Sequence, residues 1–259
     1  GIGRDDHFTV YSKRNCIITV VADGAGSARL SGLGSKIVCE TSNDLIRKEL
    51  SSKDGLLSDQ ISNYFRNSKE AKPLRTSLYN ILANSAFQSY KALSKEAEKI
   101  HERIQLFHTT LLITISKKFD FGYFIGSFQI GDGISAIYRK DKEVILLGWP
   151  DSGEYAGQTK FVTDKSLISS GEELMKRIQY KIVPDYDAVF SMSDGITDPV
   201  FGHEKNLKSN EYWNDLYNTL QHELNISDCK SMSPDKLLLD WLHFYKEREH
   251  DDRTLVIIL

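Results

Sequence analysis

Apolar residues follow two different periods along the first hundred residues. The run at residues 16–22 is rich in β-branched side chains and ends at an Asp-Gly pair, which predicts a buried strand followed by a sharp turn. Residues 11–15 are typical of the turn from a preceding strand. Apolar side chains then recur at helical spacing over residues 31–50 and 78–104, so we expect two long amphipathic helices. The segment 51–73 between them is polar and mixed.

From residue 109 the pattern changes to short β-rich pieces separated by polar or glycine turns, which predicts an antiparallel meander. These pieces are residues 109–116, 121–130, 134–139 and 143–147. Residues 150–170 are rich in Gly, Ser, Thr and Asp, and we expect an irregular excursion there.

The last third of the chain alternates strands and helices again. Residues 188–192 and 254–259 predict strands, and apolar repeats at 212–220 and 237–245 predict helices, the second begun by Ser233-Pro234-Asp235. The sequence contains no internal repeat, long linker or low-complexity tract, so one α+β domain over residues 1–259 is the simplest interpretation.

Composition excludes several classes of protein. With 259 residues, 40% of them hydrophobic and 27% charged, the chain has the balance of a globular protein that buries a large core. The formal net charge of -3 provides no global positive field for nucleic acid, and the apolar runs are too short for a membrane span, so neither partner is expected. Cys16, Cys39 and Cys229 are odd in number and form no CxxC pair, which fits a reducing cytoplasm.

Acidic residues stand at the ends of several predicted strands. Apolar runs lead into Asp23-Gly24, Asp132-Gly133 and Asp194-Gly195, while Asp5-Asp6 and Asp251-Asp252 precede the first and last strands. Any one Asp-Gly pair is ordinarily a turn. Strands of one sheet bring their ends to a common edge, however, and carboxylates gathered there repel one another unless cations bind.

All of these candidate ligands are oxygen donors. Because no His or Cys stands at matching positions, the set favours Mg²⁺ or Mn²⁺ over zinc. Two such ions, roughly 3.5–4 Å apart, would make a water acidic enough to attack at neutral pH and would neutralise phosphoryl oxygens. The chemistry indicated is hydrolysis of a phosphate ester.

Five motifs in order resemble the metal-dependent protein phosphatases of the 2C type. They are residues 21–27 (Val-Ala-Asp-Gly-Ala-Gly-Ser), the Thr109-Thr110 pair, 130–133 (Ile-Gly-Asp-Gly), 193–198 (Ser-Asp-Gly-Ile-Thr-Asp) and 251–254 (Asp-Asp-Arg-Thr). The first of them, and residues 154–159 (Glu-Tyr-Ala-Gly-Gln-Thr), are similar to a bacterial branch of that family. The resemblance spans residues 5–259.

The resemblance implies roles for the acidic residues. It makes Asp6, Asp23, Asp194 and Asp251 the catalytic set, with Asp23 bridging two metal ions. The metal ligands that it implies are Asp5, Asp6, Asp23, Gly24 through its carbonyl, Asp194 and Asp251, with Asp132 and Asp198 holding a third ion in some members. Asp252 would lie behind the ligands.

The same resemblance implies an architecture and an activity. The fold would be a four-layer α-β-β-α sandwich of two antiparallel β-sheets flanked by helices, with residues 150–170 as a flap beside the site. The enzyme would hydrolyse phosphoserine or phosphothreonine on a protein with a metal-bridging hydroxide and without a covalent intermediate. Its partners would be a phosphoprotein substrate and a cognate Ser/Thr kinase, and the chain would be a cytoplasmic monomer.

Two positions depart from the family pattern. Ala25 stands where the family often has a His that protonates the leaving oxygen, and the phosphate-binding Arg or His would lie upstream of Gly1. Arg29, in the loop before the first long helix, is a candidate replacement phosphate ligand, although a solvated surface Arg is the simpler interpretation.

Three other interpretations compete with this one. A dinucleotide fold requires a third Gly where the chain has Arg29, and Asp23 would face a pyrophosphate. A haloacid-dehalogenase-type phosphatase needs Asp-x-Asp, whereas Asp23 is followed by Gly24-Ala25. The serious alternative is a phosphatase-like domain that is catalytically weak or inactive and acts as a phosphoprotein-binding or regulatory module.

Overall fold

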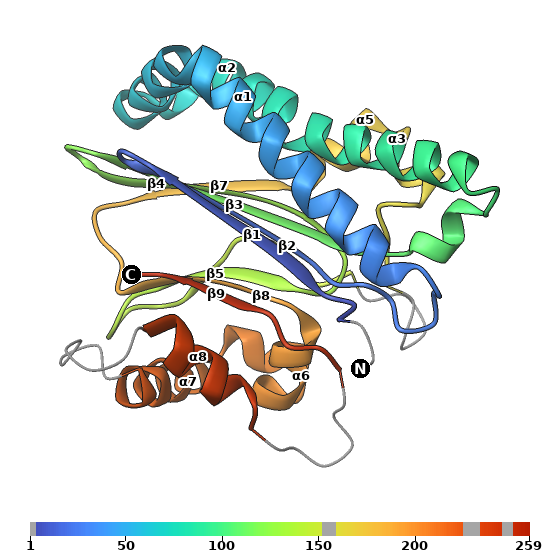
Figure 1. Cartoon of the computed structure of the whole chain (residues 1–259). Coiled ribbons are helices and arrows are strands. Elements are labelled where there is room, and N and C mark those ends of the chain that lie inside the picture. Colours follow the sequence, from blue (N-terminus) through green and yellow to red (C-terminus); the bar gives the residue numbers. More distant parts are fainter. Residues whose placement is uncertain (1–3, 152–158, 225–233, 245–250) are drawn as a thin grey trace.

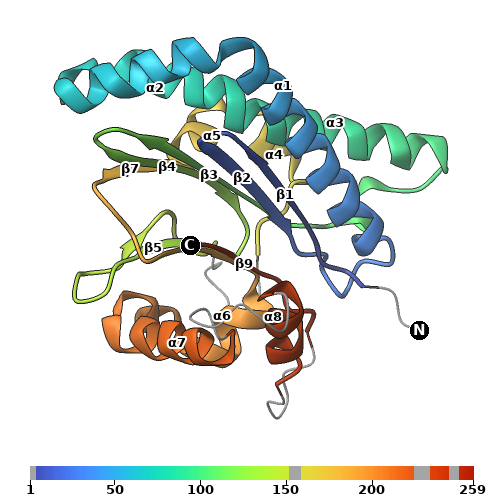
Figure 2. The same ribbon diagram turned by 60° about the vertical axis from the view of Figure 1, so that its left-hand side comes forward.

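Two antiparallel β-sheets pack face to face with helices on both outer faces (Figures 1 and 2). The computed structural model describes residues 4–151, 159–224, 234–244 and 251–259. Helices α1, α2 and α3 cover one sheet, and α6, α7 and α8 cover the other. The predicted four-layer α-β-β-α sandwich is therefore confirmed.

The larger sheet contains five strands in the described residues, in the order β1-β2-β3-β4-β7. Their bounds are β1 (His7–Lys13), β2 (Cys16–Ala22), β3 (Leu111–Phe119), β4 (Gly122–Ile130) and β7 (Ile178–Val183). Strand β7 was not predicted, although its polar residues Gln179 and Lys181 alternate with apolar ones as in a half-buried strand. This edge strand lacks the continuous apolar run that marks a strand buried on both faces.

The smaller sheet contains four strands in the described residues, in the order β6-β5-β8-β9. They are β5 (Ile134–Tyr138), β6 (Ile145–Leu146), β8 (Ala188–Met192) and β9 (Leu255–Ile258). The single meander predicted from residue 109 is wrong, because β3 and β4 pair in one sheet whereas β5 and β6 pair in the other. The chain passes from the larger sheet to the smaller one at Gly131, whose φ of 112° is readily adopted by glycine and is strained for other residues.

The helical layer over the larger sheet differs from its prediction at both helices. It contains α1 (Ser31–Arg66), α2 (Ala71–Leu78), the π-helical turn η2 (Tyr79–Ala83) and α3 (Asn84–Lys99). Helix α1 continues past its predicted end at residue 50, through a break at Lys53 with φ of -126°. Leu57 and Ile61 follow the buried Leu50 at helical spacing and are buried as well, although residues 51–66 look mixed in sequence.

The remaining helices include both of the late ones that were predicted. They are α4 (Lys165–Ile168), α5 (Gly171–Lys176), α6 (Asp194–Phe201), α7 (Asn210–Glu223) and α8 (Pro234–Leu242), with short 3-10 turns at η1 (Ser68–Glu70), η3 (Ile104–Phe107) and η4 (Glu204–Lys208). Helix α4 lies inside the excursion expected at residues 150–170. Of the predicted features, Ser233, Tyr245, Cys229 and residues 152–158 lie outside the described residues.

The core has apolar layers outside the sheets and a partly polar layer between them. One cluster joins β2, β3 and β4 to α1 and α3, and another joins β5 and β8 to α6 and α7. Between the sheets, the buried hydroxyl of Thr114 bonds to Ser135 at 2.6 Å and to Ser191 at 2.9 Å. These bonds fix the distance between the sheets. Among the described residues, no helix is long and apolar enough to cross a membrane.

Candidate metal centre

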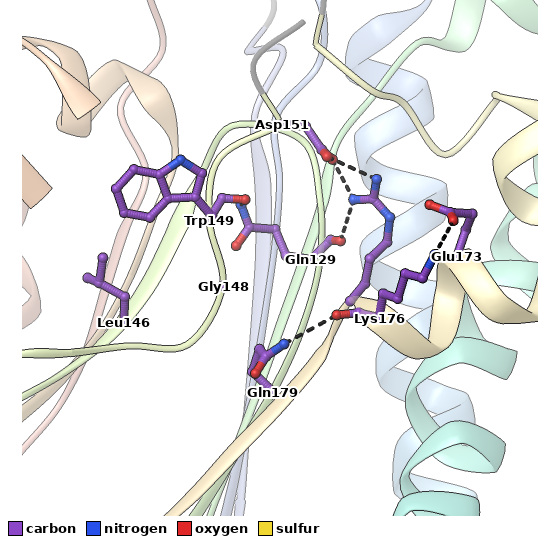
Figure 3. A pocket seen from close by; sticks show the side chains of 9 residues that line it. Gln129, Leu146, Gly148, Trp149, Asp151, Glu173, Lys176 and Gln179 are labelled. Carbon is purple, nitrogen blue, oxygen red and sulfur yellow. Dashed lines mark hydrogen bonds and ion pairs between the residues drawn. The ribbon is translucent and has the colours of Figure 1, made fainter. Parts of the chain in front are cut away.

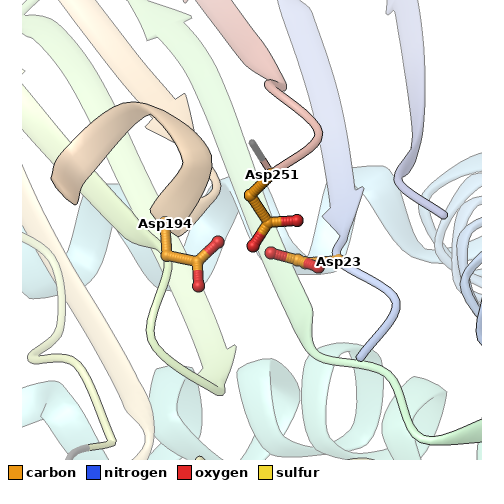
Figure 4. A group of neighbouring side chains, drawn as sticks. All are labelled: Asp23, Asp194 and Asp251. Carbon is orange, nitrogen blue, oxygen red and sulfur yellow. The ribbon is translucent and has the colours of Figure 1, made fainter. Parts of the chain in front are cut away.

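Three carboxylates from distant parts of the chain meet at one edge of the sandwich (Figure 4). Asp23 follows β2, Asp194 is the first residue of α6, and Asp251 precedes β9. One oxygen from each lies within 4.8 Å of the other two. Asp23 is buried, Asp194 is half-buried and Asp251 is exposed, so the group opens to solvent on one side.

The backbone of Asp23 is held by the predicted threonine pair. Thr110 donates its N–H to the Asp23 carbonyl at 2.8 Å, and the Asp23 N–H donates to the Thr110 hydroxyl at 2.9 Å. The Thr109 hydroxyl donates to the same carbonyl at 2.7 Å. At Gly24 an added Cβ would lie 2.6 Å from the backbone oxygen of Asp5, so only glycine fits between these segments.

Asp6 lies beneath the group and is 1% exposed. Its Oδ2 accepts hydrogen bonds from the hydroxyls of Ser193 at 2.9 Å and Thr254 at 2.8 Å. Its Oδ1 is buried without a hydrogen-bond partner among the described residues, as is Oδ1 of Asp194. Sequence reasoning gave Ser193 and Thr254 no role, although each stands close to a motif aspartate and could have been found as a hydroxyl donor there.

Asp252 holds the chain that carries Asp5 and Asp6. Its Oδ2 accepts the N–H of Asp5 at 2.5 Å and that of Asp6 at 3.2 Å. The Asp5 carboxylate accepts a hydrogen bond from the Ser31 hydroxyl at 3.1 Å, at the start of α1. Asp252 therefore fixes the backbone of residues 5 and 6 by accepting their N–H groups. One carboxylate oxygen of Asp5 is bonded to Ser31 at the start of α1.

Burial and mutual repulsion raise the pKa values of Asp6, Asp23 and Asp251. Burial raises the pKa of Asp23 to about 12, assisted by the neighbouring carboxylates of Asp194 and Asp6. Burial also raises the pKa of Asp6 to about 7 and, with the Asp194 charge, raises the pKa of Asp251. Cations bound among the carboxylates would lower these pKa values, because a neighbouring positive charge favours the ionised form.

Asp132 and Asp198 lie near Asp194 but outside the group of three. Asp132 is in the turn between β4 and β5, where burial and the Asp194 charge raise its pKa to about 6. Its Oδ2 accepts a hydrogen bond from the Thr159 hydroxyl, a contact that sequence reasoning missed. Both aspartates line a small pocket of about 50 Å³ that also contains His203.

The structure does not place Arg29 with these carboxylates. Its guanidinium pairs with Glu102, and 65% of its side chain is exposed. The N–H of Ala25 donates to the His108 carbonyl at 3.0 Å, and the His108 ring stacks on Phe161 with centroids 4.7 Å apart. The backbone of His108 therefore lies beside the position where the family often has its own His, while the imidazole packs on Phe161.

The donor set fits a hard divalent cation. The ligand atoms that the grouped residues offer are carboxylate oxygens, and oxygen ligands are those that Mg²⁺ and Mn²⁺ prefer. Two of the oxygens, on Asp6 and Asp194, are buried and unpartnered among the described residues, which costs free energy unless a ligand binds them.

Comparison with known proteins places this arrangement in a family. Stp1 from Staphylococcus aureus shares 16% identity at a TM-score of 0.52, over 98% of this chain and 88% of that chain. A bacterial serine phosphatase shares 14% identity at a TM-score of 0.51, over 98% and 91%. Identities this low establish the fold alone, and no curated protein matches by sequence. The family model for protein phosphatase 2C matches residues 1–242, so the chain belongs to the protein phosphatase 2C family.

Proposed function

We propose that the chain is a metal-dependent serine/threonine protein phosphatase. The observation that carries this proposal is the approach of the carboxylates of Asp23, Asp194 and Asp251 to within 4.8 Å, in a member of the protein phosphatase 2C family. Carboxylates that are gathered and unneutralised are costly, and they persist where cations bind them.

Asp6, Asp23, Asp194 and Asp251 would hold two Mn²⁺ or Mg²⁺ ions, with Asp5 and the Gly24 carbonyl beside them. Asp132 and Asp198 would hold a third. The ions would supply the positive charge that acidifies a water molecule and neutralises the phosphoryl oxygens. This water would attack the phosphorus directly, so that no covalent enzyme intermediate would form.

The residues of the chain prepare the site for this charge. The Thr109-Thr110 pair fixes the backbone of Asp23, while Ser193 and Thr254 orient Asp6 from beneath. Without cations the group would repel a phosphate dianion, so substrate binding should depend on the ions as much as hydrolysis does. Asp251 is the exposed member of the group, so a phosphorylated serine or threonine on a protein surface would approach from its side.

Two observations favour a second candidate, a module that binds phosphoprotein and hydrolyses it slowly or not at all. Ala25 brings no acid to the leaving oxygen, and Arg29 is engaged with Glu102. Under either candidate we expect a phosphoprotein and a cognate Ser/Thr kinase as partners, and a monomeric protein in the cytoplasm.

The deciding experiment measures phosphate release from para-nitrophenyl phosphate and from phosphoserine and phosphothreonine peptides. Each substrate is assayed with Mn²⁺, with Mg²⁺ and with chelator, and Asp23→Asn serves as the control for contaminating phosphatases. The proposal requires release that depends on the metal and on Asp23. Metal-dependent peptide binding without release would instead establish the binding module.

A further inference from the structure

An ion pair lies against the turn that carries Asp132. This turn, Gly131-Asp132-Gly133, links β4 to β5. The pair joins Arg177, just before β7, to Asp151. It is bidentate, with N–O distances of 2.5 and 2.9 Å, and the two side chains are only 16% and 18% exposed (Figure 3).

Asp151 is bonded to Gly131 in both directions. The Gly131 N–H donates to Oδ2 of Asp151 at 2.8 Å, and the Asp151 N–H donates to the Gly131 carbonyl at 2.9 Å. Arg177 also donates to the backbone carbonyl of Gln129 at 3.0 Å. The ion pair therefore holds the chain on the N-terminal side of Asp132.

Gln129 holds the turn on both sides of Asp132. Its Nε2 lies 3.0 Å from the carbonyl oxygen of Gly131, 2.7 Å from that of Gly133 and 3.1 Å from that of Trp149, and its two N–H groups donate among these three carbonyls. The side chain is buried, and Figure 3 shows it between Trp149 and Asp151. One amide therefore ties the two residues that flank Asp132 to the chain that leads into the ion pair.

We propose that Gln129, Asp151 and Arg177, which we call the turn bracket, are positioning residues that hold Asp132 where it binds an ion. This inference rests on the proposed function for the ion itself. None of the three side chains is a proposed ligand, so they act through the backbone of residues 131–133. Partners of this kind typically contribute ~10–100-fold to metal affinity.

The chemistry of the bracket requires arginine. A guanidinium donates two parallel hydrogen bonds to one carboxylate and a further one to Gln129, whereas an ammonium group cannot reproduce the fork. Arg177→Lys keeps the charge and so avoids leaving Asp151 largely buried without a cation. It is the variant that tests geometry rather than folding.

The test compares Arg177→Lys with Asp132→Ala and with the double variant. Lys176→Met is the matched control, because Lys176 adjoins Arg177 but is 59% exposed and pairs with Glu172 and Glu173. Mn²⁺ binding is measured by calorimetry, and hydrogen exchange is measured at the Gly131 amide. We expect Arg177→Lys to speed this exchange at least ~10-fold. We also expect it to weaken binding of the same ion whose binding Asp132→Ala weakens.

The double variant should bind this ion no more weakly than Asp132→Ala alone, because the bracket acts only through Asp132. The proposal would be overturned if Arg177→Lys showed the native exchange rate at the Gly131 amide and the native affinity for the ion. It would also be overturned if the losses of ion affinity in the two single variants added in the double variant. Both measurements are independent of turnover. If the native chain released no phosphate, the proposed function would be refuted. The exchange and ion-binding measurements would still decide whether the turn bracket positions Asp132.

Discussion

The hydroxyl of Thr254 donates a hydrogen bond of 2.8 Å to Oδ2 of Asp6, although the two residues are 248 positions apart. Ser193 donates to the same oxygen at 2.9 Å and accepts the Thr254 N–H at 3.1 Å. Asp6 leads into the larger sheet, whereas Ser193 and Thr254 flank strands of the smaller one. The carboxylate is therefore oriented only once the two sheets have packed together.

Thr254→Val should destabilise the protein, because it removes a buried donor to Asp6 and keeps nearly the same shape. Loss of such a bond costs about 1–3 kcal/mol of unfolding free energy. Urea unfolding measures the difference, and Thr254→Ser, which keeps the hydroxyl, is the control. Equal stability of the Val and Ser variants would show that the bond contributes nothing.

Asp194→Asn and Asp251→Asn should each weaken Mn²⁺ binding and lower turnover by orders of magnitude while leaving the fold intact. Neither residue is part of the apolar core, and each substitution removes one ligand charge. Calorimetry and phosphate release measure the two effects. Asp59→Asn, at an exposed position of α1, is the control. Unchanged turnover in both site variants would rule out their role as ligands.

The ion-free protein should become more stable as the pH falls from about 7.5 to about 5. Asp6 has a folded pKa of about 7 and Asp132 of about 6, against an ordinary value of 3.8. In this window the folded state binds more protons than the unfolded state, so acidification favours folding. Thermal unfolding across the pH range measures the slope.

Two comparisons isolate this pH effect from other titrating groups. Burial lowers the pKa values of His7 and His108, which gives a slope of opposite sign. Asp6→Asn should therefore reduce the gain at low pH or reverse it. Excess Mn²⁺ should stabilise the protein more at about pH 7.5 than at about pH 5, because protons and ions compete for the same carboxylates.

Ala25→His should raise turnover of phosphoserine peptides more than that of aryl phosphates. General acid catalysis is worth ~10²–10⁴-fold, and it helps most when the leaving oxygen is basic. Plotting log kcat against leaving-group pKa should give a steep line for the native chain and a flatter one for the variant. A flat native line would falsify the missing-acid hypothesis, because it would mean that another group already protonates the leaving oxygen.

The ends of apolar runs could be located from the sequence because they depend on local patterns. The run at residues 16–22 and its Asp-Gly boundary appear in the structure as β2 followed by Asp23. Strand β7 and the second half of α1 were missed because their apolar residues are few and are diluted by polar ones. The period of each element is kept, with alternation in β7 and with Leu57 and Ile61 at helical spacing in α1, but only the packed structure shows that these residues are covered.

The order of motifs along the chain was sufficient to indicate the family and the oxygen-donor chemistry, because residue types and their spacing are properties of the sequence. Which carboxylates meet is a different kind of fact. Asp23, Asp194 and Asp251 come together only because β2, β8 and β9 have ends at the same edge after the sheets have packed. The turn bracket around Asp132 and the hydroxyls on Asp6 likewise depend on contacts between residues far apart in sequence, and no local period encodes such contacts.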